Sequence, residues 1–118
     1  MGVRIPPGAH AFSYNRVKRV YPHTNYAFVM FCVYVLKSSK DLKLYIGSTS
    51  DLKRRVEEHN KGLVGSTKAR RPLKLVYYEA YSSEEDARNR EKQLKLRGQA
   101  RRHLVNRIKN SIGEQKHS

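Results

Sequence analysis

The chain has 118 residues, 38% hydrophobic and 30% charged, which suffices for one compact domain with a modest core. Its net charge is +15, from 25 Lys and Arg against 10 Asp and Glu. A protein this basic usually binds a polyanion, and we favour nucleic acid over an anionic membrane surface or simple solubility. Cys32 is the only cysteine, which excludes an internal disulfide framework and a cysteine-based zinc site, and fits a reducing cytoplasm.

Residues 1–29 differ in composition from the rest. They hold four basic residues, no acidic residue and three of the four prolines, without periodicity, so we expect a flexible basic arm. The segment Val3–Pro7, VRIPP, is also what the T-arm of a transfer RNA gene would encode. An alternative is therefore that the true start is Met30. We expect one domain over residues 30–112 and a disordered tail over 113–118.

The apolar run Tyr26–Leu36 follows Arg16, Lys18 and Arg19, an arrangement that resembles a secretory signal. The run is about 11 residues, whereas a spanning helix needs about 17–25. No small-residue cleavage site follows it. We therefore favour a buried strand and expect no membrane partner.

Two strands are expected first, over Phe31–Ser38 and Leu42–Ser48, because both are rich in β-branched, aromatic and alternating apolar residues. A two-residue loop between them would place Tyr34 directly opposite Tyr45. Both phenols would then emerge on one face of the hairpin, although a one-residue slip would separate them. Ordinary packing in a strand is the alternative reason for two tyrosines.

Three helices and one more strand are expected downstream. We predict that Ser50 caps the first helix and Gly62 helps to end it, and that Ser82 with Glu85 starts the second helix, which Gly98 terminates. The predicted elements are a helix over Asp51–Asn60, a strand over Leu73–Tyr81, a helix from Ser82 to Gly98 and a helix over Gln99–Ile112. The order β-β-α-β-α-α predicts an α+β fold with a small, mainly antiparallel three-stranded sheet flanked by helices.

Polar residues break the apolar face of the first helix. At 100° per residue, Leu52 and Val56 define the inner face, and Arg55 and His59 flank it, while Arg54 points to solvent. A charge beside the core costs free energy unless it has a partner. Arg55 therefore either pairs or reaches solvent as a structural residue, or it binds a ligand.

The second helix shows the same anomaly with an acid. Glu91 lies between Ala87 and Leu94 on the apolar face, while Arg90, Lys92 and Lys95 are expected in solvent. One interpretation is a buried Glu91–Arg55 ion pair. The other is a metal site, because Mg²⁺ prefers one or two carboxylates together with water and phosphate oxygens.

Together, these side chains suit phosphodiester hydrolysis. Arginine holds a phosphate with two donors, and a metal ion on a carboxylate stabilises the developing charge and the leaving oxygen. A phenol or an imidazole can orient or deprotonate the attacking water.

These residues resemble the GIY-YIG nuclease superfamily, in particular its small stand-alone bacterial members. Tyr45-Ile46-Gly47 matches the second signature, and Arg55 follows Tyr45 by ten residues as in that family. The resemblance covers Phe31 to about Asn110. The first signature differs, since Val33-Tyr34-Val35 stands in place of Gly-Ile-Tyr.

The resemblance implies a role for each residue. Tyr34 and Tyr45 would be the two signature tyrosines, Arg55 would position the scissile phosphate, His59 would support the water or the phosphate, and Glu91 would hold a single Mg²⁺ or Mn²⁺. A phenol has an ordinary pKa near ~10, so it would need basic surroundings to act as a base. We favour Tyr34 as that base and leave Tyr45 open.

We therefore expect a cytoplasmic, metal-dependent endonuclease that cuts DNA, with a structure-specific activity and an RNA substrate both left open. The alternative is a non-catalytic DNA- or RNA-binding module on a nuclease fold. Relatives often take their target choice from an attached DNA-binding domain, so the resemblance leaves the substrate open. Basic residues outside the site are expected to follow the phosphate backbone: Lys68, Arg70, Arg71, Arg97, Arg101, Arg102, Arg107 and Lys109.

Overall fold

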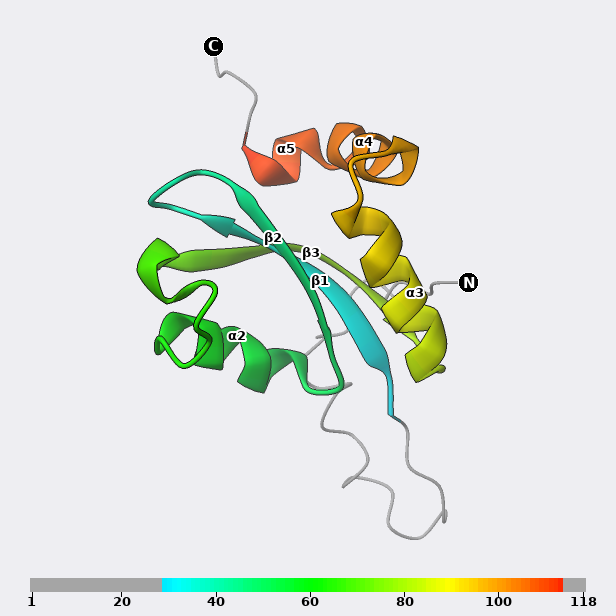
Figure 1. Cartoon of the computed structure of the whole chain (residues 1–118), viewed down its shortest axis with the longest axis horizontal. Coiled ribbons are helices and arrows are strands. Elements are labelled where there is room, and N and C mark those ends of the chain that lie inside the picture. Colours follow the sequence, from blue (N-terminus) through cyan, green and yellow to red (C-terminus); the bar gives the residue numbers. More distant parts are fainter. Residues whose placement is uncertain (1–28, 114–118) are drawn as a thin grey trace, which may run out of the picture.

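The computed structural model describes residues 29–113 (Figure 1). The predicted arm and the predicted tail lie outside the described residues, apart from positions 29 and 113, whereas Met30, the alternative start, is described. The described elements are β1 (Phe31–Ser38), β2 (Leu44–Thr49), α2 (Leu52–Asn60), the 3₁₀ turn η3 (Lys68–Arg70), β3 (Leu73–Tyr81), α3 (Glu84–Lys95), α4 (Gln99–Arg107) and α5 (Lys109–Ile112). This is the α+β fold predicted from the sequence.

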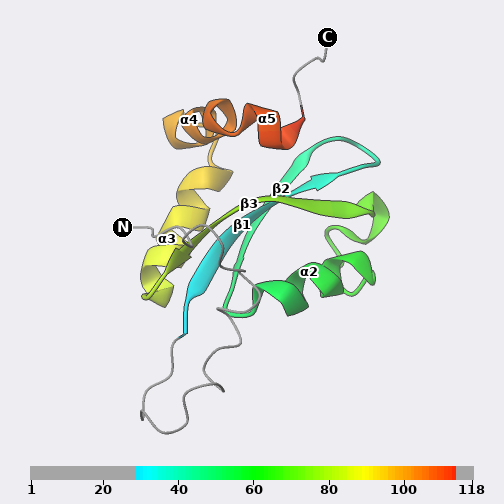
Figure 2. The same ribbon diagram turned by 180° about the vertical axis from the view of Figure 1, so that it is seen from behind.

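The sheet has the strand order β2-β1-β3, and both strand pairs are antiparallel. Central strand β1 is buried on both faces, as its nearly continuous apolar sequence requires. Val33 and Val35 pack in one cluster with residues of α3, α4 and α5, whereas Tyr34 and Leu36 pack in a second cluster with Leu52 of α2. Figures 1 and 2 show α2 on one side of the sheet and α3 to α5 on the other.

The predicted register of the β1–β2 hairpin is wrong by two residues. Tyr34 pairs with Gly47, and Leu36 pairs with Tyr45. The connection is longer than two residues because the Ser38 hydroxyl accepts from the backbone N–H of Lys40 and Asp41, which holds the chain in a wider turn. A shift of two residues leaves each side chain on its original face, so the two tyrosines still share the α2 side of the sheet.

The helix caps lie one residue later than predicted. Asp51, rather than Ser50, caps α2, and its carboxylate accepts from the Arg54 N–H at 3.1 Å. Ser83, rather than Ser82, caps α3 by accepting from the Asp86 N–H at 3.2 Å. Aspartate and serine are both good caps, so neighbouring candidates cannot be ranked by residue type alone.

The C-terminal helices are also divided differently. Helix α3 ends at Lys95, and Gly98 stands at the start of α4 rather than at the end of α3. The single helix predicted over Gln99–Ile112 is interrupted at Ile108, whose backbone leaves helical geometry (φ −110°, ψ 25°). Ile108 is buried in the core, so this break lets both short helices pack on the sheet.

The loop between α2 and β3 is held at its base by Asn60. Its amide donates to the Leu73 carbonyl at 2.8 Å, and its carbonyl oxygen accepts from the Leu73 N–H at 2.7 Å. Gly62 ends the helix with a positive φ of 79°. This clamp places Thr67 of the loop against the α2 side chains.

Within residues 29–113, no helix is both long enough and apolar enough to cross a membrane.

Candidate active site

A hydrogen-bonded chain of three buried side chains lies between β1 and α2. The Tyr34 hydroxyl lies 2.8 Å from Nε2 of His59, and Nδ1 of His59 lies 2.7 Å from the Thr67 hydroxyl. Tyr34 is 1% exposed, and His59 and Thr67 are fully buried. Sequence analysis did not single out Thr67, because a threonine in a polar loop carries no pattern that separates it from its neighbours.

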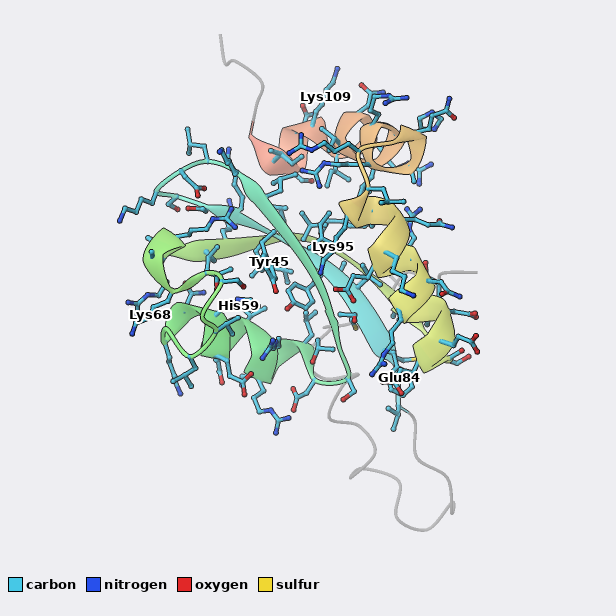
Figure 3. The ribbon with its side chains drawn as sticks, viewed as in Figure 1. Tyr45, His59, Lys68, Glu84, Lys95 and Lys109 are labelled. Atoms are coloured by element: carbon cyan, nitrogen blue, oxygen red, sulfur yellow. The ribbon has the colours of Figure 1, made fainter. Side chains whose placement is uncertain are left out.

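Tyr45 of β2 completes an aromatic cluster with these residues. Its ring centroid lies 4.9 Å from that of His59 and 6.4 Å from that of Tyr34. The Tyr45 ring is tilted relative to the Tyr34 ring and meets the His59 ring edge-on, and aromatic pairs prefer such geometries. Tyr45 is only half-buried, so this phenol is the more accessible of the two. Figure 3 shows Tyr45 and His59 on one side of β2 and Lys95 on the other.

The Tyr34 phenol leaves no room for a side chain at Gly47. A Cβ at this position would lie 2.5 Å from the Tyr34 hydroxyl and 2.7 Å from its Cζ. Both distances are too short for any real side chain. The glycine of the Tyr45-Ile46-Gly47 signature therefore leaves room for the Tyr34 hydroxyl to cross the edge strand.

The protonation of the buried pair differs from the sequence-based expectation. Burial raises the pKa of Tyr34 to about 12, and the hydrogen bond with Arg55 only partly opposes that shift. The basic surroundings that Tyr34 would need to act as a base therefore do not lower its pKa. Burial, with the nearby Arg55 charge, also lowers the pKa of His59 to about 4, so the imidazole is neutral at physiological pH.

Arg55 lies at the edge of this cluster rather than in it. Its side chain is 37% exposed, and it donates to Glu58 at 3.0 Å. The buried Arg55–Glu91 ion pair considered from the sequence is not formed. Arg54 points to solvent, as predicted. Arg55 therefore presents a partly accessible guanidinium beside the Tyr34 phenol.

Glu91 of α3 reaches the opposite side of β2. Its carboxylate accepts from the Ser48 hydroxyl at 2.6 Å and pairs with Lys95 at 2.8 Å. These hydrogen bonds and the lysine charge lower the pKa of Glu91 against the effect of burial, so the group is ionised at neutral pH. Glu91 is close enough to Tyr34 for its charge to help raise the pKa of the phenol.

The side chains around Glu91 fit a hard divalent metal ion. A carboxylate beside a hydroxyl oxygen is a hard donor set, which suits Mg²⁺ or Mn²⁺. Among the described residues, no three His, Cys, Asp or Glu side chains gather at one place. A metal here would therefore be held by Glu91, with water and substrate phosphate as its other ligands, and Lys95 would have to move aside.

Glu79 forms a second polar cluster that sequence analysis missed. This buried carboxylate accepts from the hydroxyls of Tyr77 and Tyr81 at 2.7 and 2.6 Å and is paired with Arg90 at 2.9 Å. Arg90 was expected in solvent, and that expectation is wrong. The cluster lies among core residues on the α3 side of the sheet, where both carboxylate oxygens of Glu79 have partners, so we assign it to stability.

The structure divides the predicted nucleic-acid-binding residues between two regions. Near α2, Lys68 is exposed, Arg70 is bound to Asp41 at 2.7 Å, and Arg71 folds back onto the Lys68 carbonyl. Around α4, Arg97 and Arg102 are exposed, and Arg101 donates to the Leu94 carbonyl. The loop region therefore offers fewer free cations than its sequence suggests.

Comparison with known proteins identifies the family of the chain. The family model of the GIY-YIG catalytic domain matches residues 30–107. A UPF0213 protein of Pediococcus pentosaceus is 47% identical over 68 residues, which cover 57% of this chain and 70% of that protein. A UPF0213 protein of Staphylococcus aureus is 45% identical over 64 residues, covering 53% of this chain and 77% of its own.

A solved structure is also similar. The solution NMR structure of a UPF0213 protein from Bacillus halodurans aligns with a TM-score of 0.44 and 26% identity, covering 75% of this chain and 99% of that one.

Proposed function

The chain belongs to the GIY-YIG catalytic-domain family, and from this premise we propose that it is a metal-dependent endonuclease that hydrolyses phosphodiester bonds in DNA. The observation that carries the proposal is the Tyr34–His59–Thr67 chain, close to the ionised carboxylate of Glu91. A structural core gains little from three buried polar side chains, whereas hydrolysis needs a path for the proton of the attacking water.

The hydrogen-bond directions support Tyr34 as the group that handles this proton. The Thr67 hydroxyl faces the Val64 carbonyl at 3.5 Å, which can only accept a hydrogen bond. If Thr67 donates there, it accepts from Nδ1–H of His59, and Nε2 is left with its lone pair toward the Tyr34 hydroxyl. The phenol then donates to His59, and its oxygen can accept hydrogen bonds, one of them from Arg55.

The raised pKa of Tyr34 shapes the proposed mechanism. The phenol keeps its proton at neutral pH, so it can take a proton from water only by passing its own to a neighbour. Nε2 of His59 is the acceptor in position to receive it. Without substrate, the low pKa of His59 keeps Nε2 unprotonated. The negative charge of a bound phosphate would raise the basicity of the imidazole.

The remaining site residues act on the phosphate. Arg55, partly exposed beside the phenol, is placed to hold a nonbridging oxygen. The half-buried phenol of Tyr45 can donate to the phosphate or orient the water. A divalent metal on Glu91 would supply charge stabilisation for the leaving oxygen.

The decisive test is cleavage of labelled single-stranded, duplex, flapped and four-way-junction DNA with Mg²⁺ or Mn²⁺. Glu91→Gln should lose cleavage by at least about 100-fold while retaining DNA affinity. Glu85→Gln is a matched control, since Glu85 is an exposed acid in the first turn of the same helix. Equal activity of wild type and Glu91→Gln would contradict the proposal.

A non-catalytic nucleic-acid-binding module is the second candidate. It is favoured by Lys95, which already neutralises Glu91, and by the near-complete burial of Tyr34. Tight, salt-sensitive binding of DNA or RNA, with no cleavage of any substrate under either metal, would support this reading instead.

A further inference from the structure

A groove of about 910 Å³ opens between the β1–β2 connection and α4. Five basic residues line it: Lys43, Arg97, Arg101, Arg102 and Lys109. None of the described residues that line it is acidic. The groove therefore has a concentrated positive charge and is complementary to a chain of phosphates.

The floor of the same groove is aliphatic. Leu42, Leu44 and Val105 contribute to its lining, and Leu42 is 65% exposed. Leu42 also has a positive φ of 62°, a conformation that bulky residues rarely adopt. This conformation belongs to the turn, in which the Leu42 N–H donates to the Ser38 carbonyl at 3.0 Å, and it leaves the Leu42 side chain exposed at the groove, where it can make an apolar contact with a ligand.

The groove lies beside the candidate active site, because both use residues of β2. Leu44 lines the groove, Tyr45 contacts His59, and Ser48 contacts Glu91. Ser48 lies four positions after Leu44 along the strand, which is about 13 Å at ~3.3 Å per residue. Lys95, which pairs with Glu91, is the last residue of α3, and Arg97 at the groove follows two residues later.

We propose that this groove binds an unpaired strand of the nucleic-acid substrate that extends away from the scissile phosphate. The arginines and lysines contact its phosphates, and the aliphatic floor contacts its bases and sugars. A duplex could pair its phosphates with the basic residues, but it could not place its bases against the aliphatic floor, because its base faces are stacked inside the helix. The inference rests on the proposed function for the position of the scissile phosphate, and on the groove alone for strand binding.

The test measures affinity without catalysis. Labelled 20-nucleotide single-stranded, 5′-flapped and duplex DNA are titrated with the full chain in EDTA, at several salt concentrations. Arg102→Gln/Lys109→Gln removes two exposed groove cations, and Arg54→Gln/Arg88→Gln removes two exposed cations elsewhere. Both double variants have the same net charge.

The groove variant should bind single-stranded and flapped DNA about tenfold more weakly than the control variant. Its log Kd should also depend less on log salt, by about 1.4, since each lost phosphate contact on a single strand contributes ~0.7. Equal weakening of both variants would overturn the proposal. The proposal would also be overturned if duplex DNA bound the wild type as tightly as single-stranded DNA and lost as much affinity in the groove variant.

Leu42→Asn tests the aliphatic floor separately. Asparagine tolerates positive φ better than leucine, so this variant should fold with an unchanged or higher Tm. It should nevertheless bind single-stranded DNA several-fold more weakly, and unchanged affinity would remove Leu42 from the interface. If the wild type cuts no DNA while the groove variants still lose binding, the proposed function fails and the groove assignment stands.

Discussion

The Tyr34 hydroxyl lies directly over the backbone of Gly47, its partner across the β1–β2 ladder. This single contact joins the two tyrosine signatures of the family structurally, because the phenol of the first can reach His59 only where the second has no side chain. The glycine is thus required by packing at this point and not by backbone conformation.

Replacing Gly47 with alanine should displace the Tyr34 ring. A Cβ would meet the phenol oxygen at 2.5 Å, and the Tyr34 side chain is already buried in the core. We expect a loss of about 1–3 kcal/mol in the free energy of unfolding, measured by denaturant titration. DNA cleavage should fall as well, because Tyr34 would no longer align with His59.

Gly65→Ala is the matched control for that substitution. A Cβ at Gly65 meets no atom within 4 Å, so its free energy of unfolding should stay within about 0.5 kcal/mol of wild type. Similar losses in the two variants would show that the Tyr34 contact is not the cause.

Thr67→Val should change the tautomer of His59 without changing its surroundings in size. Valine cannot accept from Nδ1–H, so a buried nitrogen loses its partner at a cost of about 1–3 kcal/mol. The ¹⁵N chemical shifts of the His59 ring should show Nδ1 protonated in the wild type and a mixture of tautomers in the variant. Cleavage should fall at least tenfold, whereas Thr67→Ser should retain it; an unchanged spectrum in Thr67→Val would contradict the assigned direction.

Stability should fall as the pH drops from about 6.5 toward 4. In the unfolded chain His59 has a pKa near ~6.5 and binds a proton in this range, whereas the folded protein, with a pKa of about 4, does not. The free energy of unfolding should therefore decrease by about 2 kcal/mol between pH 7 and pH 5. The pKa values of Glu79 and Glu91 are lowered, so protonation of these acids contributes mainly below this range.

His59→Gln provides the comparison for the pH measurement. Glutamine has no titrating group, so the variant should be less stable at pH 7 and nearly independent of pH between 7 and 5. A wild-type profile as flat as that of His59→Gln would show that the imidazole is not held in its neutral form.

Local residue chemistry was enough to predict the three strands, the order of strands and helices up to α4, and the side of the sheet on which the tyrosines lie, but not the division between α4 and α5. Strand β3 is found at the predicted residues, and β1 likewise. The hairpin register was not predictable in the same way, because Ser38 closes the turn through hydrogen bonds that depend on the folded loop. The prediction of a shared face survived only because the error was two residues and not one.

Helical periodicity showed which residues interrupt an apolar face, but not their partners. His59 is buried as predicted, whereas Arg55 pairs with Glu58 of its own helix and Glu91 pairs with Lys95. Partners such as Thr67 and Glu79 come from the loop and from another strand. Such contacts over long sequence separations are set by the assembled fold, and a single sequence contains no periodic signal for them.

Disrupting the Glu79 cluster should lower the stability of the protein without lowering its cleavage rate. Arg90→Gln removes the charge that compensates a carboxylate only 8% exposed, so we expect a loss of about 2–4 kcal/mol in the free energy of unfolding. Arg88→Gln is the control, because Arg88 is 67% exposed and its i,i+4 pair with Glu84 contributes at most about 0.5 kcal/mol. Under conditions where Arg90→Gln is folded, its cleavage rate should equal that of the control. A selective loss of cleavage in Arg90→Gln would instead place the Glu79 cluster in the catalytic machinery.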